Sequence, residues 1–188
     1  MNDGHLKYLS SPEWAAQIKD ELLPWVIGAR ALGDDFLEVG PGPGLTTNVL
    51  QTLVPRLTAV EVDPGLAASL AERLATASVE VVHADATAMP FEADRFSGAA
   101  CLTMLHHVPS PGLQDKLFLE LCRVLRPSGV LVGCDSIDTP EVRAGHHDDI
   151  FTPIDPGSLG ARLEAAGFEN VDIEVKDNKV RFAATKAL

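Results

Sequence analysis

The chain has 188 residues, of which 46% are hydrophobic and 22% charged, and its formal net charge is −12. This length suits one domain with a sizeable core, and the composition excludes an intrinsically disordered chain. The acidic balance argues against a nucleic-acid binder, because contacts to phosphates need clustered Lys and Arg.

Membrane and compartment signals are also weak. No apolar run is long and uninterrupted enough to span a membrane, and no secretory signal opens the chain. The odd number and wide spacing of Cys101, Cys122 and Cys134 argue against a disulfide framework or a zinc site. We therefore expect a cytoplasmic protein with three reduced core thiols.

The first 34 residues predict a helical lid or appendage. After about ten polar residues, Ser11 can cap a helix that continues to Val26 with apolar residues at helical spacing. Pro24 should kink or divide this helix. Residues 35–188 are expected to form the main body of what is a single domain overall.

From residue 36 onward, strands and helices alternate. We expect strands at 36–39, 57–62, 79–83, 96–103 and 130–134, and helices at 45–54, 64–76, 112–125 and 155–166. The tail predicts a β-hairpin, with strands at 171–175 and 180–185. The pattern therefore indicates an α/β, Rossmann-like, doubly wound sheet of seven strands, mostly parallel, with an antiparallel strand from the C-terminal hairpin.

A glycine-rich turn follows the first strand, in Glu38-Val39-Gly40-Pro41-Gly42-Pro43-Gly44. Three alternating glycines let the backbone turn sharply and approach a ligand closely, and the two prolines stiffen the loop. Dinucleotide-binding folds prefer G-x-G-x-x-G, whereas the sixth position from Gly40 is Leu45. A tight connection without a ligand is the plain alternative.

Acidic residues end the next two strands. Glu61 stands 21 residues after Gly40, where a carboxylate can accept hydrogen bonds from both ribose hydroxyls of a nucleotide cofactor. Asp63 is the second candidate for binding these hydroxyls, and we expect it instead to cap the following helix. Asp85 follows the third strand, where by itself it is either a binding residue or a solvated turn residue.

Together these motifs resemble the class I S-adenosylmethionine-dependent methyltransferases, over Asp35 to Lys186. The stretch Leu102–Val108, with its L-H-H-V sequence, and the element Arg123–Leu131 resemble the small-molecule branch that includes quinone-biosynthesis enzymes. The sequence departs from the family in one place, because Ser97 follows Phe96 where an Asp is usual.

The resemblance implies an enzyme that transfers a methyl group from S-adenosylmethionine to a small-molecule acceptor and releases S-adenosylhomocysteine. It places the cofactor on Glu38, Gly40, Pro41, Gly42, Gly44, Glu61, Val62, Asp85, Ala86 and Leu102. No nucleic-acid partner is expected, and a homodimer is left open. The alternatives are an NAD(P)-dependent oxidoreductase, argued against by the missing sixth glycine, and a non-catalytic cofactor-binding module.

Methyl transfer from a sulfonium needs positioning more than a nucleophile or a metal, so we expect no metal site. His106 and His107 follow the fourth strand and are candidates for a catalytic base, with the pattern favouring His106. Consecutive side chains diverge, so at most one should face the pocket. Packing beneath the cofactor is the other interpretation of each.

The segment 139–153 is expected to be a loop over the acceptor pocket. It contains His146-His147-Asp148-Asp149, but adjacent residues rarely all reach one ion, so a solvated or substrate-facing loop is the favoured interpretation. Tyr8, Trp14 and Trp25 are expected either to form a lid over the cofactor or to pack on the sheet.

Overall fold

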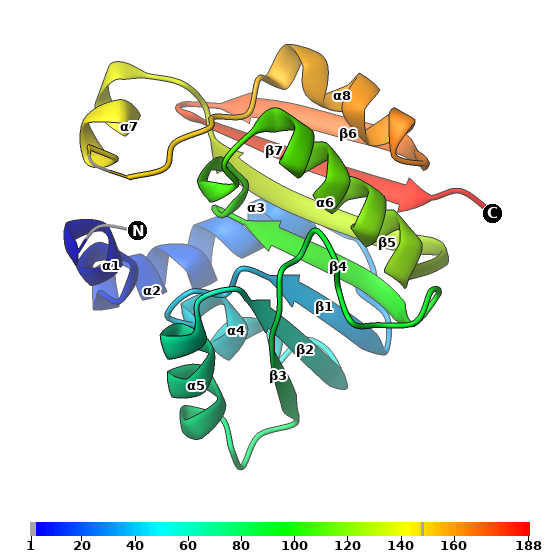
Figure 1. Ribbon diagram of the computed structural model, residues 1–188, viewed down its shortest axis with the longest axis horizontal. Helices are drawn as coiled ribbons and strands as arrows, with labels where there is room; N and C mark the ends of the chain where they lie inside the picture. Colours follow the sequence, from blue (N-terminus) through cyan, green and yellow to red (C-terminus); the bar gives the residue numbers. More distant parts are fainter. Residues whose placement is uncertain (1–2, 148) are drawn as a thin grey trace.

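A seven-stranded sheet in the order β3-β2-β1-β4-β5-β7-β6 forms the centre of the computed structural model, which describes residues 3–147 and 149–188 (Figure 1). The strands are β1 Asp35–Val39, β2 Arg56–Glu61, β3 Val79–His83, β4 Phe96–Leu102, β5 Leu125–Ser136, β6 Phe168–Lys176 and β7 Lys179–Lys186. Neighbours among β1 to β5 pair in parallel, and β7 pairs antiparallel with both β5 and β6. The predicted mixed sheet is confirmed.

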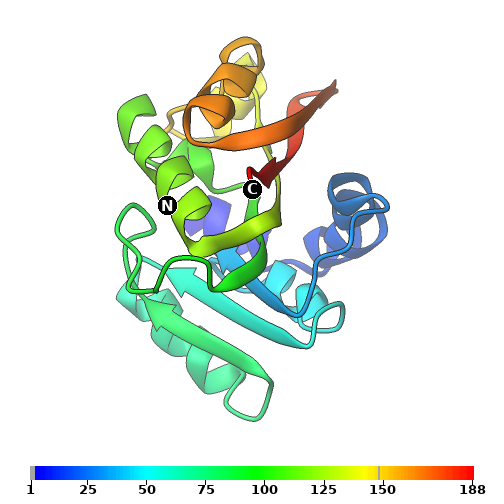
Figure 2. The same cartoon turned by 90° about the vertical axis from the view of Figure 1, so that its right-hand side faces the viewer.

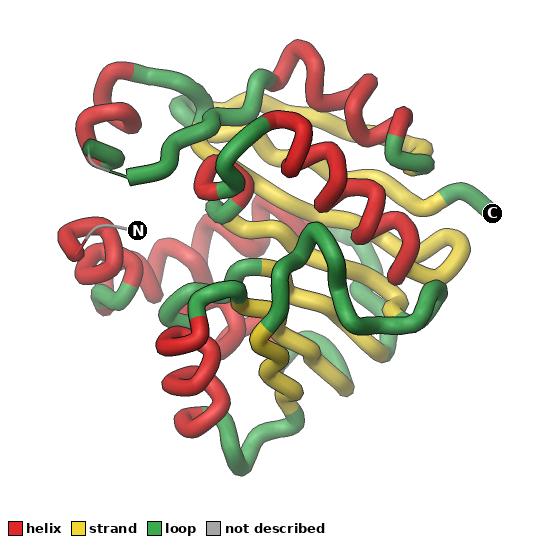
Figure 3. Tube along the Cα trace, viewed as in Figure 1, coloured by secondary structure: helices red, strands yellow, loops and turns green. Residues whose placement is uncertain are grey.

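Helices cover both faces of this sheet, as the doubly wound prediction requires (Figures 2 and 3). They are α1 Asp3–Leu9, α2 Pro12–Gln17, the π-helix η1 Ile18–Leu22, α3 Leu23–Ile27, α4 Leu45–Leu50, α5 Pro64–Arg73, the 3-10 helix η2 Leu105–His107, α6 Pro111–Val124, α7 Pro140–Gly145 and α8 Pro156–Ala165. Within this described part of the chain, no helix is long and apolar enough to cross a membrane.

The strands bury side chains on both faces because successive side chains point in opposite directions. In β1, Phe36 packs with residues of α2, η1, α3 and α4, whereas Leu37 packs with residues of α6 and α8. Ala59 of β2 packs against Leu70 of α5. The continuous apolar runs of the inner strands therefore follow from a sheet covered on two sides.

The N-terminal helix is divided at the predicted place. Ser11 caps α2 by accepting a hydrogen bond from the Trp14 N–H, and Pro24 lies in the first turn of α3. The π-helical turn η1 directly precedes this proline, and the N–H of Leu23 bonds the carbonyl of Ile18. The wider turn joins α2 to α3, whose second residue, Pro24, lacks an N–H donor.

The largest differences from the sequence predictions lie in three places. The first ten residues include the helix α1, and the loop predicted at 139–153 contains the short helix α7, which Thr139 caps. The strand β5 begins at Leu125, where a helix end was expected, and its register shifts before Val130. Short capped turns and an irregular strand carry little periodic signal, so the pattern did not predict them.

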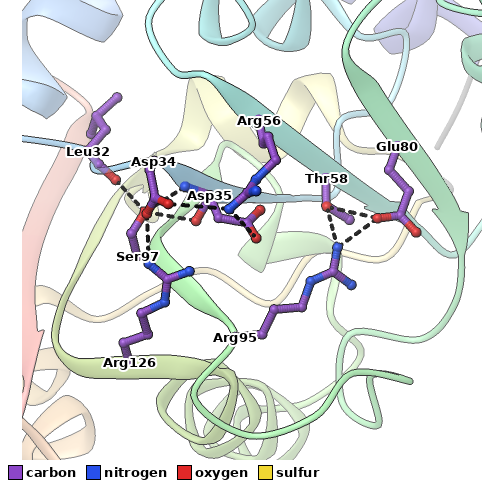
Figure 4. A network of polar contacts seen from close by, with 9 residues as sticks. All are labelled: Leu32, Asp34, Asp35, Arg56, Thr58, Glu80, Arg95, Ser97 and Arg126. Atoms are coloured by element: carbon purple, nitrogen blue, oxygen red, sulfur yellow. Dashed lines mark hydrogen bonds and ion pairs between the residues drawn. The ribbon is translucent and has the colours of Figure 1, made fainter.

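A polar network lies at the edge where the parallel strands begin (Figure 4). Ser97 accepts a hydrogen bond from the Asp35 N–H, and its hydroxyl lies 3.1 Å from the Leu32 carbonyl and 2.9 Å from the Asp35 carbonyl. Arg126 pairs with Asp34 at 2.7 Å. Ser97, which departs from the family pattern, therefore still ties the start of β4 to the start of β1.

Ser128 gives a test of the irregular start of β5. It is exposed and has a φ of 63°, a left-handed conformation that glycine adopts without strain. We expect Ser128→Gly to raise the free energy of unfolding by about 0.5–1 kcal/mol, since relief of strain exceeds the added chain entropy. Chemical denaturation measures this difference.

Ser78→Gly is the matched control, because Ser78 is exposed and does not have a positive φ. It should lower stability by roughly 0.5 kcal/mol. Equal changes in the two variants would show that Ser128 is not strained.

Candidate functional site

A cavity of about 470 Å³ opens at the edge where the parallel strands end, and this volume is typical of sites for small ligands. Its walls come from the ends of β1, β2, β3 and β4 and from the N-terminal helices, with two residues of the loop after α7. Figure 1 shows α1 and α7 on this side of the sheet. The lining residues are Leu9, Trp14, Ile18, Val39, Gly40, Pro41, Gly42, Pro43, Leu45, Thr46, Val60, Glu61, Val62, Asp63, Leu66, Ala84, Asp85, Ala86, Thr87, Leu102, Thr103, Met104, His107, Val108, Pro109, Leu113, Leu117, Asp149 and Ile150.

The glycine-rich turn forms one wall of the cavity. Gly40 and Gly42 have φ values of 67° and 53°, which glycine adopts without steric cost. A Cβ on Gly40 would lie 2.9 Å from the Cβ of Met104, so the backbone passes too close to the end of β4 for a side chain. The turn therefore presents main-chain atoms to the cavity.

Glu61 is a buried carboxylate in the wall of the cavity. Its side chain is 5% exposed, and its two carboxylate oxygens each accept one backbone hydrogen bond, from Gly42 N–H and from Asp63 N–H, both at 3.0 Å. A carboxylate has about four acceptor positions. Two contacts therefore fix the orientation of Glu61 and leave acceptor capacity for ligand hydroxyls.

Asp85 lies beyond the end of the neighbouring strand. Its Oδ1 accepts a hydrogen bond from the Thr87 N–H at 2.8 Å, which holds the turn that carries Ala86. Val62, at the end of β2, is 64% exposed and lines the same cavity. The arrangement is one apolar side chain beside carboxylates on two adjacent strand ends.

Eight of the ten predicted cofactor residues line the cavity, and Glu38 and Gly44 do not. Gly44 lies against α5, because a Cβ there would lie 2.4 Å from Leu70 and 2.5 Å from Arg73. Arg73 also donates a hydrogen bond to the Pro43 carbonyl at 2.7 Å. Gly44 therefore lets α5 approach the turn.

Glu38 lies behind the turn, in β1, and is 1% exposed. It accepts a hydrogen bond from the hydroxyl of Thr46 in α4, so it connects β1 to the helix that follows the turn. Burial raises the pKa of Glu38 to about 7, and the hydroxyls of Thr46 and Thr47 oppose this rise.

The rings of the two candidate histidines lie close together instead of diverging, with centroids 4.1 Å apart, and of the two it is His107 that lines the cavity. His106 is 2% exposed, and its Nδ1 lies 2.5 Å from Oδ1 of Asp135. Asp135 is fully buried at the end of β5 and also accepts the Leu105 N–H at 2.8 Å. The sequence pattern favoured His106, whereas the geometry gives His107 the contact with the cavity.

The predicted lid residues are separated by the structure. Trp14 lines the cavity, and Tyr8 packs on it with ring centroids 5.4 Å apart. Trp25 packs against the core formed by the N-terminal helices and the sheet. Of the predicted His146–Asp149 cluster, Asp149 lines the cavity, His146 meets His106 and His107, and Asp148 lies outside the described residues.

Residues 37–133 match the protein family described as "Methyltransferase domain". The chain belongs to this family. This confirms the resemblance drawn from the glycine-rich turn and from Glu61 and Asp85, and the matched segment contains both histidines that follow β4.

Two curated methyltransferases and one solved structure show how far the likeness extends. The demethylmenaquinone methyltransferase of Clavibacter sepedonicus is 33% identical over 121 residues, which cover 63% of this chain and 48% of that protein. Ribosomal RNA small subunit methyltransferase A of Acidithiobacillus ferrooxidans is 39% identical over 70 residues, 37% of this chain and 26% of that protein. The chain thus spans about half the length of the first relative and about a quarter of the second.

A S-adenosylmethionine-dependent methyltransferase from Aquifex aeolicus has the same fold. Its structure aligns with a TM-score of 0.74 at 20% identity and covers 98% of each chain. The fold and the family therefore agree.

The residues of the cavity fit S-adenosylmethionine chemically. A nucleoside offers ribose hydroxyls as donors, an adenine amino group as a donor and a flat apolar ring. Glu61 and Asp85 supply acceptors at two strand ends, and exposed Val62 supplies an apolar surface beside them. The glycine-rich turn supplies main-chain atoms close to the same space.

The raised pKa of Glu38 predicts a pH dependence of stability. Because the folded protein holds this proton more tightly than the unfolded chain, the contribution of Glu38 to stability is fully present below pH 4.5 and is lost as pH rises through about 7. Between pH 5 and 8, deprotonation of Glu38 should lower the free energy of unfolding of wild type by up to about 3 kcal/mol. We expect Glu38→Gln to abolish this part of the pH dependence. Urea unfolding at several pH values measures it.

Glu169→Gln is the control, because Glu169 is a glutamate on the exposed surface of β6. It should leave the wild-type pH profile unchanged. A Glu38→Gln profile as steep as that of wild type would contradict the assignment.

Proposed function

We propose that this protein is a methyltransferase that moves a methyl group from S-adenosylmethionine to a small-molecule acceptor by in-line displacement. One observation carries the proposal: Glu61 and Asp85 face one cavity from adjacent strand ends, beside exposed Val62 and the glycine-rich turn. The family membership supports the same activity.

Each part of the cavity then has a task. Glu61 accepts hydrogen bonds from the ribose hydroxyls, and Asp85 accepts one from the adenine amino group, next to the backbone of Ala86. Gly40, Pro41 and Gly42 would hold the methionine part, and Leu102 contributes an apolar side chain to the cavity wall. When bound, the cofactor supplies a methyl group that its sulfonium has already activated. The apolar walls exclude water and hold the acceptor atom in line with that methyl group.

Glu38 and Gly44 support this site from outside the cavity. Glu38 holds α4 behind the turn through Thr46, and Gly44 lets α5 pack against it. Both residues therefore position the cofactor loop, and neither is assigned a direct contact with the cofactor.

A small acceptor is favoured over RNA. The longer match is to a demethylmenaquinone methyltransferase, whereas the match to a ribosomal RNA methyltransferase covers 37% of this chain. The net charge of −12 gives little attraction for phosphates. His107, Leu113 and Ile150 line the cavity and are not among the predicted cofactor residues, so we assign the acceptor to them.

We further propose that residues 1–34 act as a lid over residues 35–188. Leu9, Trp14 and Ile18 line the cavity, so opening of the N-terminal helices would expose it. The cytoplasmic location and a homodimer stay predictions.

Cofactor binding tests the two carboxylates. A hydrogen bond to a charged group contributes about 1.5–3 kcal/mol, so we expect Glu61→Gln and Asp85→Asn each to weaken S-adenosylhomocysteine binding by about 10- to 100-fold. Isothermal titration calorimetry measures the dissociation constants. Glu72→Gln is the control, because Glu72 lies on the exposed side of α5 and should bind like wild type.

Activity is tested by transfer of a labelled methyl group to a panel of phenols, quinols and amines, with ribosomal RNA as a separate arm. Transfer to a small acceptor is the expected result. Transfer to RNA alone would contradict the assigned acceptor class. Binding of NAD or NADP without binding of S-adenosylhomocysteine would establish the oxidoreductase alternative.

A further inference from the structure

The adjacent residues His106 and His107 meet a histidine that is distant in the sequence, His146, beside the cavity. His106 and His107 lie in η2, directly after β4, and His146 follows α7. Ring centroids lie 4.1 Å apart for His106 and His107, 4.8 Å for His106 and His146, and 5.6 Å for His107 and His146. One ring nitrogen from each histidine lies within 4.8 Å of the other two.

Hydrogen bonds on the far side of two rings set their tautomers. His106 Nδ1 lies 2.5 Å from the Asp135 carboxylate, and His146 Nδ1 lies 2.7 Å from the Val142 carbonyl. Both partners are acceptors, so each Nδ1 carries a proton, and in the neutral imidazole that binds a metal the lone pair is then on Nε2. A carboxylate or carbonyl that accepts the second ring N–H is the usual support of a metal-binding histidine.

The surroundings hold this arrangement in place. His106 is 2% exposed, and fully buried Asp135 is fixed by the backbone N–H of Leu105 and of Ser136. Phe151 stacks on the His146 ring at a centroid distance of 4.6 Å. The buried carboxylate and the stacked ring therefore fix the orientation of two of the three imidazoles.

We propose that His106, His107 and His146 form a binding site for a divalent transition metal of the Zn²⁺ type. Neutral imidazole suits Zn²⁺, Co²⁺ and Ni²⁺, and three protein ligands leave a fourth position open on a tetrahedral ion. Zn–N bonds of about 2.0–2.1 Å place ligand nitrogens roughly 3.3 Å apart, so binding draws the rings together by at most about 1.5 Å.

The open coordination position should face the cavity, because His107 lines the cavity and His106 is buried. An oxygen or nitrogen atom of the acceptor can reach the ion from the cavity. This orienting role rests on the proposed function, whereas metal binding itself does not. The proposed site departs from the expectation of no metal, which rested on the chemistry of methyl transfer and on the lack of ligand spacing in the sequence.

The test is Zn²⁺ binding by the tag-free protein, measured by competition with a chromophoric chelator and by metal analysis after dialysis. We expect one equivalent of Zn²⁺ per chain. His146→Ala should weaken binding at least tenfold, because it removes one of three ligands. His147→Ala is the matched control, since His147 is the exposed next residue outside the cluster, and it should bind like wild type.

Asp135→Asn gives a second measurement that does not remove a ligand. We expect it to lower Zn²⁺ affinity by about 10- to 100-fold, the usual effect of losing the carboxylate behind a ligand histidine. The visible spectrum of the Co²⁺-loaded protein should change in both His146→Ala and Asp135→Asn. Circular dichroism verifies that each variant is folded. If Asp135→Asn does not fold, the comparison of His146→Ala with wild type alone tests the metal site.

Two outcomes overturn the metal site: wild type that binds no stoichiometric Zn²⁺, or equal affinity in wild type, His146→Ala and His147→Ala. Each variant is also titrated with S-adenosylhomocysteine. Loss of Zn²⁺ binding with intact S-adenosylhomocysteine binding concerns the histidine cluster alone. Failure of wild type to bind S-adenosylhomocysteine would instead remove the proposed function and leave the Zn²⁺ result standing.

Discussion

The hydrogen bond from the Gly42 N–H to Glu61 joins the loop after β1 to the end of β2, and the geometry of the cavity depends on it. The bond requires the loop to turn with positive φ at Gly40 and Gly42, which glycine does without strain. It also holds a buried carboxylate in one orientation, with acceptor capacity directed at the cavity. Loop shape and binding chemistry are therefore set by the same contact.

Asp135 performs a similar task at the end of β5. It accepts the backbone N–H of Leu105 and holds the ring of His106, so the turn after β4 and the histidine within it are fixed together. The Thr152 N–H donates to the His106 carbonyl at 2.7 Å, which brings the segment after α7 to the same place. Two acids at strand ends thus organise two sides of one cavity.

Much of this could be predicted from the sequence, because strand ends and glycine turns leave local patterns. Glu61 and Asp85 are found by their position after apolar runs, and a parallel sheet brings such positions to one edge. The different roles of His106 and His107 could not be predicted, since the direction of each ring depends on Asp135, which lies 29 residues from His106.

The meeting of His146 with the other histidines was missed for the same reason. A loop has no periodicity that tells which strand end it crosses, and the short helix α7 was itself unexpected. A signal was nevertheless present: Asp135 is an acid at the end of an apolar strand, and a buried acid needs a donor. That requirement points toward a nearby histidine, although it does not say which one.

The acidic residues at the beginnings and at the ends of the parallel strands have different partners. Where the strands begin, Asp34 and Asp35 have arginine partners, Arg126 and Arg56. Where they end, Glu38, Glu61 and Asp135 are buried, and none has a Lys or Arg partner among residues 3–147 and 149–188. Burial of such groups costs stability, so a chain shaped by folding alone would not concentrate them there. The proton on Glu38, ligand hydroxyls at Glu61 and a cation reached through His106 would each offset one part of this cost.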